Sequence, residues 1–525
     1  MDNAFAGPLF QNQLITIRWG DGYVRVEPES ALTDLKRELT YYHRTISQKP
    51  RSGKSIQGEY RKLYESHFHV DDDQNVANYL VTLPGFMHRI KSLFDAQGYN
   101  YKIIDERTPM PPMDVKKAMS GLYAYQYEPV LDLLLSGGGI ASCPTGFGKT
   151  HLMAAIARAY DPDDLQVRST PLTVFAASDK DVTRKNYEDF CEIFPDRDVG
   201  IMMSGRTKRS EDIQVITLDS LHRIDPEEVG LLIIDEVHSA GTDARTKKIS
   251  ECRKAAKWGF SATPFGRFDG GDLKTEGLVG PAVVDIPYSK GVEVGALVPI
   301  TVYYLNSPEP PIGVTSYQRY KSRHKQVQVG IEGNDALNDL VVEIFQRLPE
   351  ETQAMAIMPH IYQIDELKKR MPDVQEVHGE TSQDSLIQKG YHDTQAIGSK
   401  QREQIYRDMA SGDTKRIIAT YVYKQGVNFP QLEVMVCPGG GGSKLVSGQV
   451  PGRASRRIAG KDKSFIVDFW HPWDTVSEPG FKEGRKKDGP LLRDDRARDK
   501  VYEKLGFNRV WADSIDELPF IPAKT

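Results

Sequence analysis

The chain is poor in cysteine. Its 525 residues include four cysteines, Cys143, Cys191, Cys252 and Cys437, and none of them belongs to a C-x-x-C pair. Cysteines scattered in this way argue against a disulfide framework and against a cysteine-based zinc site. A reducing compartment is the expected environment for such a chain.

Long apolar runs are missing as well. No stretch approaches the roughly 20 apolar residues that span a bilayer. The first residues, MDNAFAGPLFQNQ, lack the basic start and the apolar segment of a signal peptide. We therefore expect a soluble, cytoplasmic protein with no membrane partner.

The chain also lacks a strong charge of either sign. Its formal net charge is −5, with 27% charged and 39% hydrophobic residues, which is ordinary for a soluble globular enzyme. This balance argues against a protein that coats nucleic acid through its overall charge, but it does not exclude a local basic groove. A chain of 525 residues is too long for one hydrophobic core, so we expect about two to four domains.

Proline-rich punctuation at residues 106–114 marks the end of a first domain. Before it, an alternating pattern around Gly20-Asp21-Gly22 predicts a hairpin, and apolar spacing predicts helices over residues 31–44 and 86–97, the second ending near Gly98. These elements predict a small α+β domain over residues 1–112.

After residue 113 short continuous apolar strands alternate with helices, which is typical of buried parallel sheets. The pattern occurs twice, with the segment YYLNSPEPPIG in the connecting region. The predicted fold class is therefore α/β, with two tandem parallel-sheet domains after the small N-terminal domain. We place them at residues 113–298 and 299–475, followed by a C-terminal extension over residues 476–525.

The stretch SCPTGFGKT resembles a phosphate-binding loop, although Cys143 occupies its first position, where the pattern has glycine. Gly146 and Gly148 allow backbone N–H groups to turn toward phosphate oxygens, at the start of a predicted helix. Lys149 would reach the β- and γ-phosphates and Thr150 would bind Mg²⁺. A glycine-rich turn that happens to end in Lys-Thr is the alternative for the loop taken alone. The predicted nucleotide-binding residues here are Thr145, Gly146, Phe147, Gly148, Lys149 and Thr150.

An acidic pair supplies the second half of a nucleotide site. Asp235 and Glu236 directly follow the apolar strand LLII. One carboxylate at such a strand end can bind Mg²⁺, and its neighbour can orient or deprotonate the attacking water. A strand that ends in solvated acids is the alternative, but together with the loop this layout predicts an ATP-hydrolysing P-loop enzyme.

Three further motifs give the chain a family resemblance. The sequence DEVH at residues 235–238 resembles a DExH box, SATP at residues 261–264 resembles motif III, and QVPGRASR resembles motif VI of superfamily 2 helicases. The motifs occur in the family's order between about residues 123 and 474. The resemblance implies two RecA-like domains, ATP and Mg²⁺ as cofactors, and nucleic acid as the partner.

The resemblance also assigns roles to residues. It implies a catalytic set of Lys149, Asp235 and Glu236 with the motif VI residues Gln449, Arg453 and Arg456, in which the arginines approach the γ-phosphate. It implies that Gln126 contacts adenine, that Gly426 belongs to motif V, and that Ser261 and Thr263 couple nucleotide state to nucleic-acid binding. Taken alone, the arginines of motif VI would be interpreted as a solvated helix face.

Candidate nucleic-acid contacts are less specific. The resemblance places Gly205, Thr217 and Thr420 near the nucleic-acid backbone, where small and hydroxyl residues favour sequence-independent binding. Residues 44–62 hold six basic residues, Arg51 and Lys54 among them, against one acid, with tyrosines nearby. That composition favours phosphate binding and base stacking, but a flexible charged loop flanked by core tyrosines explains it equally well.

The segment after motif III indicates a branch of the superfamily. Gly280-Pro281, Gly295, Leu297 and Pro299 fill a pattern that is similar to the one in XPB-like and UvsW-like DNA translocases. Residues 381–399 interrupt the second unit and carry no predicted role. The resemblance implies a monomeric DNA helicase or translocase that acts on single-stranded or branched DNA in replication, recombination or repair, in a bacterium or a phage-infected cell. An RNA helicase and an ATP-switched nucleic-acid clamp that does not unwind stay open as alternatives.

Overall fold

The computed structural model describes residues 14–28, 32–49, 53–70, 76–160, 172–267, 269–318, 322–420, 429–439, 454–458, 460–477 and 486–523. The chain divides into two compact units. The first comprises Met1–Cys143 and Gly148–Ile286, and the second comprises Pro287–Thr525 together with the turn Pro144–Phe147. No helix within the described residues combines the length and the apolar character that crossing a membrane requires.

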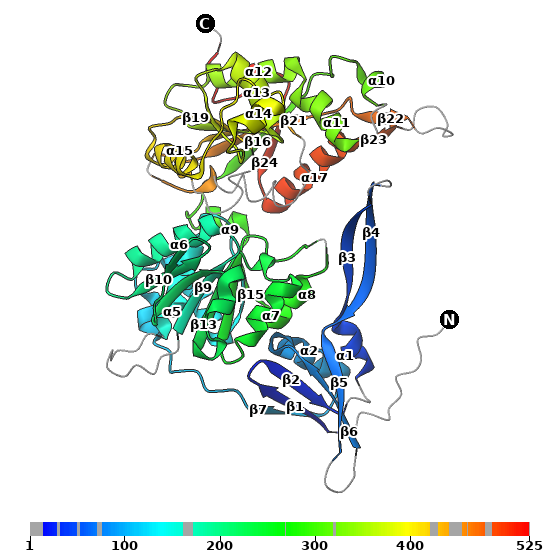
Figure 1. The fold of residues 1–525 in the computed structure, drawn as a ribbon, viewed down its shortest axis with the longest axis vertical. Helices are drawn as coiled ribbons and strands as arrows, with labels where there is room; N and C mark the ends of the chain where they lie inside the picture. The colour runs from blue at the N-terminus through cyan, green and yellow to red at the C-terminus, as the bar shows by residue number, and fades with distance from the viewer. Residues whose placement is uncertain are drawn as a thin grey trace. The chain divides into compact units, whose positions relative to one another are not determined.

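The N-terminal part of the first unit is built on a five-stranded sheet in the order β5-β6-β2-β1-β7 (Figure 1). The predicted hairpin is present as β1 (Ile15–Gly20) and β2 (Tyr23–Glu27). Helix α2 (Met87–Gln97) ends at Gly98, whose φ of 69° is left-handed, as predicted. The remaining elements of this sheet and its helices are β5 (Tyr64–Val70), β6 (Val76–Thr82), β7 (Tyr101–Asp105) and α1 (Thr33–Glu38).

The helix predicted over residues 31–44 is wrong in its second half. Helix α1 ends at Glu38, and Thr40 begins strand β3 (Thr40–Lys49), which pairs along its whole length with β4 (Gly53–Lys62). The residues Thr40-Tyr41-Tyr42 are β-branched or aromatic, and such residues favour strands when a partner strand is available. Figure 1 shows β3 and β4 as a two-stranded sheet of their own, which we call the ribbon.

The first α/β sheet has eight strands in the order β11-β10-β12-β9-β13-β14-β8-β15, and all neighbours are parallel except β10 and β11. Its central strands are buried along their length, as the continuous apolar runs predicted. The strands are β8 (Gly139–Ser142), β9 (Leu172–Ala177), β10 (Val199–Met203), β11 (Arg206–Lys208), β12 (Ile213–Thr217), β13 (Val229–Asp235), β14 (Ala256–Ser261) and β15 (Ala282–Asp285). The helices are α3 (Val115–Met119), α4 (Tyr127–Ser136), α5 (Lys149–Ala159), α6 (Lys180–Ile193), α7 (Asp243–Glu251) and α8 (Asp272–Val279).

The second unit holds a seven-stranded parallel sheet in the order β18-β19-β17-β20-β21-β16-β24. The prediction of two tandem parallel-sheet domains is therefore confirmed. The strands are β16 (Ile300–Asn306), β17 (Ala354–Ile357), β18 (Gln375–Val377), β19 (Arg416–Ala419), β20 (Val434–Cys437), β21 (Ser464–Trp470) and β24 (Asn508–Ala512), with the separate pair β22 (Thr475–Ser477) and β23 (Lys486–Asp488). The helices are α9 (Tyr288–Glu293), α10 (Val314–Tyr317), α11 (Arg323–Val327), α12 (Asp335–Arg347), α13 (Ile361–Arg370), α14 (Gln383–Gln388), α15 (Ser399–Ser411) and α17 (Pro490–Leu505).

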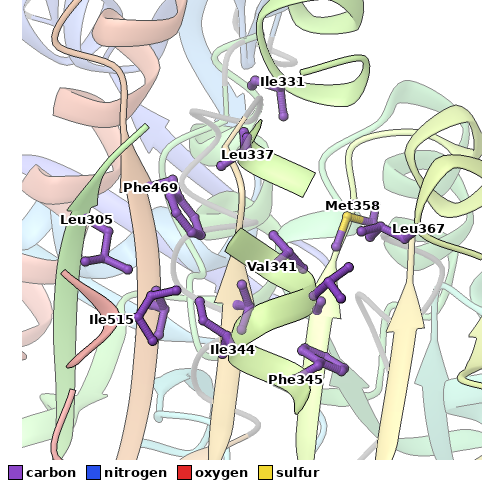
Figure 2. Packing of buried hydrophobic residues seen from close by; sticks show 14 of the residues in the cluster. Leu305, Ile331, Leu337, Val341, Ile344, Phe345, Met358, Leu367, Phe469 and Ile515 are labelled. Atoms are coloured by element: carbon purple, nitrogen blue, oxygen red, sulfur yellow. The ribbon is translucent and has the colours of Figure 1, made fainter. Parts of the chain in front are cut away.

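One face of this sheet is covered by α12. Leu337, Val341, Ile344 and Phe345 recur at helical spacing and are at most 2% exposed. Figure 2 shows these side chains beside Phe469 of β21 in one apolar cluster.

The insertion at residues 381–399 is a packed part of the second unit. It contains α14, and Leu386 and Ile397 are at most 1% exposed. The buried carboxylate of Asp365 accepts hydrogen bonds from the backbone N–H groups of Asp393 and Thr394 at 2.8 and 3.0 Å. These bonds attach the insertion to α13.

The packing of α12 makes a stability prediction. Replacing Ile344, which is fully buried, by alanine removes buried methyl groups and leaves a cavity, so Ile344→Ala should lower the free energy of unfolding by about 2–5 kcal/mol. Calorimetry of the second unit's thermal transition measures the change. Ile387→Ala is the matched control, because Ile387 is helical but 50% exposed and should change stability by less than about 0.5 kcal/mol. Equal effects of the two substitutions would contradict the packing described here.

Candidate active site

The strand order brings three motifs to one edge of the first α/β sheet. β13, β14 and β8 are consecutive neighbours and run parallel, so their carboxyl ends lie side by side. Those ends carry the acidic pair, the Ser-Ala-Thr segment and the phosphate-binding loop, respectively. Ligands of open α/β sheets bind at this edge.

The phosphate-binding loop tolerates its unusual first residue. Cys143 is fully buried, its backbone N–H donates to the carbonyl of Ser261 at 3.0 Å, and burial raises the pKa of its thiol to about 12. Cys143 therefore acts as a small apolar residue that fastens the loop to β14. The left-handed turns come later, at Gly146 (φ 91°) and Gly148 (φ 99°), and α5 begins at Lys149. A glycine is needed at these two positions and not at the first.

Lys149 faces the acidic pair. Its Nζ lies 3.5 Å from Glu236 Oε1, and both side chains are about nine-tenths buried, at 14% and 13% exposure. Burial acts to lower the pKa of Lys149, but the carboxylates of Glu236 and Asp235 outweigh it and raise the pKa above its usual value. Lys149 therefore carries a positive charge at the start of a helix, where phosphate oxygens are favoured.

Asp235 and Glu236 have opposite pKa shifts. Burial and the neighbouring negative charge of Glu236 raise the pKa of Asp235, which accepts a hydrogen bond from Asn186 at 3.2 Å. Burial also acts to raise the pKa of Glu236, but Lys149 and hydrogen bonding to His238 and Ser261 bring it down to about 2. Glu236 is thus ionised, the form in which its oxygens accept hydrogen bonds from a water molecule.

The turn that carries Glu236 is strained. Glu236 is the one non-glycine residue in the described part of the chain that has a positive φ, of 51°. Ser261 Oγ donates to Glu236 Oε2 at 3.0 Å, His238 Nδ1 lies 3.0 Å from Ser261 Oγ, and the N–H of Thr263 donates to the same oxygen at 3.1 Å. Strained backbone of this kind persists where its surroundings hold it, typically at functional sites. Of the two predicted coupling residues, Ser261 contacts Glu236 directly, and Thr263 is bonded to Ser261.

Gln126 lies against the phosphate-binding loop. It is 1% exposed, and its Oε1 accepts the backbone N–H of Tyr123 at 3.0 Å. A Cβ atom at Gly148 would lie 2.4 Å from Gln126 Nε2, so the amide occupies the space that glycine leaves. This position beside the loop fits the predicted nucleotide contact.

The predicted nucleic-acid contacts fall in different settings. Gly205 (φ 87°) is exposed in the turn between β10 and β11. Thr217 is 6% exposed, and its hydroxyl donates to Ser220 Oγ at 2.8 Å. Thr420 is half-buried after β19, and its N–H donates to the carbonyl of Val377 at 2.9 Å. Arg51 and Gly426 lie outside the described residues, and of Lys54 only the backbone, in β4, is described.

Motif VI is described in part. Gln449 and Arg453 lie outside the described residues. Arg456 forms an antiparallel bridge with Leu297, and the carbonyl of Ser455 accepts from the N–H of Val298 at 2.7 Å. The backbone of Arg456 is thereby fixed at the start of the second unit.

Two residues at the site were not predicted. Asn186 of α6 bonds to Asp235, and Arg267 Nη1 donates to the carbonyl of His238 at 2.7 Å. No local pattern marks Asn186. Arg267 follows the Ser-Ala-Thr-Pro segment closely, and its position there is the one sequence signal that could have drawn attention to it.

Comparisons with known proteins agree with this geometry. Residues 121–266 match the family model described as type III restriction enzyme, res subunit. The DNA 3'-5' translocase XPB2 of Sulfurisphaera tokodaii is 26% identical over 382 residues, which cover 68% of this chain and 82% of that protein. These matches support the interpretation of the chain as a superfamily 2 helicase of the DExH type. The predicted family and the prediction of an ATP-hydrolysing enzyme with a nucleic-acid partner are confirmed.

Solved structures share the fold of this chain. Dbp5 of S. cerevisiae, solved with RNA and ADP BeF3, aligns over 81% of this chain and 96% of its own, with 16% identity and a TM-score of 0.50. The DUF1998 helicase MrfA bound to DNA aligns over 77% of this chain and 52% of its own, with 17% identity and a TM-score of 0.50. T4 UvsW aligns over 95% of this chain and 99% of its own, with 18% identity and a TM-score of 0.40.

The contact between Gly148 and Gln126 makes a prediction about nucleotide affinity. In Gly148→Ala the new methyl group would overlap Gln126 Nε2, and the backbone would be strained at φ 99°. We expect the dissociation constant for a fluorescent ATP analogue to rise at least about tenfold, the equivalent of 1.4 kcal/mol.

Gly137→Ala is the matched control for this prediction. Gly137 also has a positive φ, of 66°, but a Cβ atom there meets no atom within 4 Å. Gly137→Ala should cost stability, about 1–2 kcal/mol, without changing ATP affinity. If both variants bound the analogue as the wild type does, the loop would not have the tight geometry described here.

Proposed function

We propose that this helicase uses ATP hydrolysis to move along DNA and to unwind or remodel branched DNA in replication, recombination or repair. The buried Lys149–Glu236 pair beside Asp235 carries the proposal, because it supplies a charged phosphate contact and an ionised base in one place. The curated relative with 26% identity is named a DNA 3'-5' translocase, which favours DNA as the track.

ATP binding is assigned to the phosphate-binding loop and its neighbours. Lys149 and the first N–H groups of α5 bind the phosphates, and Gln126 contacts the adenine beside the loop. Glu236, ionised and oriented by Ser261, takes the proton of the attacking water. As the family resemblance implies, Gln449, Arg453 and Arg456 of motif VI take part in hydrolysis, and an arginine that stabilises the transition state is worth roughly 10³–10⁵ in rate.

The residues fit a magnesium ion. Mg²⁺ prefers oxygen ligands and typically uses one or two carboxylates together with substrate phosphates. The Thr150 hydroxyl and the Asp235 carboxylate are oxygen donors, and the raised pKa of Asp235 indicates a buried acid without enough positive charge around it. When bound, the ion would neutralise charge on the phosphates.

Nucleic acid would be held without reading its sequence. Gly205, Thr217 and Thr420 would contact the sugar-phosphate backbone, and Arg51 and Lys54 of the basic segment 44–62 would supply positive charge. We infer a monomer that acts in the cytoplasm of a bacterium or of a phage-infected cell. The domains proposed are residues 1–112 (accessory), 113–298 and 299–475 (motor), and 476–525 (C-terminal extension).

Two alternatives are distinguished by assay. An RNA helicase is favoured by the fold likeness to Dbp5, whose structure was solved with RNA, and it predicts stimulation of ATP hydrolysis by RNA alone. An ATP-switched clamp predicts nucleotide-dependent nucleic-acid affinity without strand displacement.

The roles of Glu236 make a kinetic prediction. Glu236→Gln should lower kcat for ATP hydrolysis by about 10²–10⁴, because the amide cannot accept the proton, while ATP binding remains measurable. Steady-state hydrolysis and analogue binding give the two readouts, with Lys149→Ala as the blank. The control is Glu228→Gln, since Glu228 lies on the surface in a pair with Arg209. An active Glu236→Gln enzyme would contradict the assigned role.

The substrate proposal makes a second kinetic prediction. The rate of ATP hydrolysis should rise most with forked or four-way DNA, less with linear single-stranded DNA and least with RNA of matched length. Stimulation by RNA alone would leave the ATPase assignment in place and overturn the DNA assignment.

A further inference from the structure

The ribbon is bonded to the segment that follows motif III. The carbonyl of Asp269 accepts the backbone N–H of Arg44 at 3.3 Å and lies 3.1 Å from His43 Nδ1. Both His43 and Arg44 belong to β3 and lie near the end of the ribbon where β3 begins, which we call the ribbon base. The ribbon base and the residues after motif III are therefore in direct contact.

Asp269 is bonded in turn to the motif II turn. Its two carboxylate oxygens accept Arg267 Nε and Nη2 at 2.9 and 2.6 Å, and Arg267 Nη1 donates to the carbonyl of His238 at 2.7 Å. A continuous path of hydrogen bonds therefore runs from β3 through Asp269 and Arg267 to His238, which is two residues from Glu236.

The contact at the ribbon base is close as well as polar. A Cβ atom at Gly270 (φ 78°) would lie 2.6 Å from the carbonyl of Tyr42, so only glycine fits there. On the other strand, Arg61 Nη1 donates to Asp243 Oδ2 at 2.9 Å. A displacement of the ribbon base would consequently be transmitted to the Asp269 segment.

The ribbon base also carries an exposed aromatic surface on which nucleobases can stack. Tyr42 and Tyr60 are directly opposite in the β3–β4 register, 45% and 76% exposed, with their rings edge to face at 5.1 Å. The Arg44 guanidinium lies 5.9 Å from the centre of the Tyr42 ring. These exposed rings exclude the hypothesis of a charged loop flanked by core tyrosines for this pair. Exposed aromatic rings beside a cation are how single-stranded nucleic acid is held without sequence preference.

We propose that the tyrosine pair at the ribbon base binds unpaired bases of a nucleic-acid strand and that Arg267 and Asp269 carry this binding to the motif II turn. The ribbon is then a sensor that adjusts ATP hydrolysis to the presence of a strand. Arg267 and Asp269 are positioning residues, because they act on Glu236 through His238 and Ser261. This inference rests on the proposed nucleic-acid-dependent ATPase.

The test separates binding from transmission, with oligothymidylate as the probe. ATP hydrolysis is measured against oligonucleotide concentration in the full chain, and each variant is compared with its own rate without DNA. Tyr42→Ala/Tyr60→Ala should raise the concentration for half-maximal stimulation at least about tenfold, since stacking is worth about 1–3 kcal/mol per base. Arg267→Gln should leave that concentration within about twofold and lower the maximal stimulation at least about fivefold, a loss near 1 kcal/mol.

Arg197→Gln is the matched control for Arg267→Gln. The side chain of Arg197 is 15% exposed against 19% for Arg267, and it also donates to one aspartate, Asp212, through Nε and Nη2. This pair precedes β10 and β12, at the amino ends of the parallel strands, whereas motif II lies at the carboxyl end of β13. Arg197→Gln should lower stability by a similar amount, which thermal unfolding measures, but it should leave the ratio of stimulated to basal ATP hydrolysis unchanged. Combining Arg267→Gln with the tyrosine substitutions should reduce maximal stimulation no further than Arg267→Gln alone.

Three outcomes would overturn the inference. The tyrosine variant could respond to oligothymidylate as the wild type does, or Arg267→Gln could lower the basal and stimulated rates in the same proportion, as a purely structural residue would. In either case the proposed motor stands and the sensor falls. If no nucleic acid stimulates the wild type, the proposed function fails and the inference fails with it.

Discussion

A buried ammonium that faces two buried carboxylates determines the chemistry of this protein. Lys149 lies 3.5 Å from Glu236, and Asp235 precedes Glu236 in the chain. Breaking a buried ion pair typically costs about 3–5 kcal/mol, so the pair holds the phosphate-binding loop against motif II. Burial raises the pKa of Asp235 and the negative charge of Glu236 adds to the effect, whereas Lys149, His238 and Ser261 together lower the pKa of Glu236. One ammonium does not neutralise both acids. The excess negative charge favours a cation and the ammonium favours phosphate, and a nucleotide with its metal ion satisfies both.

Strand order brings these charges together. In a parallel sheet the carboxyl ends of β8, β14 and β13 meet at one edge, whereas one antiparallel strand among them would carry its motif to the opposite edge. The bond from the Cys143 N–H to the Ser261 carbonyl continues the β8–β14 ladder into the phosphate-binding loop. The loop therefore starts from a fixed point, and its first residue needs to be small and apolar rather than glycine.

Local patterns and remote contacts differ in how far a sequence reveals them. The glycines of the loop, the acidic pair and the alternation of strands and helices were predictable, because each depends on residues close together in the chain. The helix expected through Arg44 failed because Thr40 pairs with Lys62, a partner 22 residues away that helical spacing does not register. Asn186 and Arg267 were missed for the same reason, since their partners Asp235 and His238 lie on other elements. The sequence also does not reveal that Tyr42 and Tyr60 are exposed, and this exposure is what indicates a binding surface on the ribbon.

The motif II turn combines a strained backbone with a few hydrogen bonds of comparable energy. A left-handed backbone at a residue with a side chain, such as Glu236, costs about 1–2 kcal/mol. A typical hydrogen bond contributes about 0.5–1.5 kcal/mol, the same order. The turn is held by Ser261 at Glu236, by Arg267 at the His238 carbonyl and by Arg245 at the Ser239 carbonyl, 3.2 Å away. The strain at Glu236 and each hydrogen bond that holds the turn are therefore of the same order, so each bond is a large part of what keeps the Glu236 carboxylate in its position. A residue that bonds to this turn, as Arg267 does, is therefore placed to regulate hydrolysis.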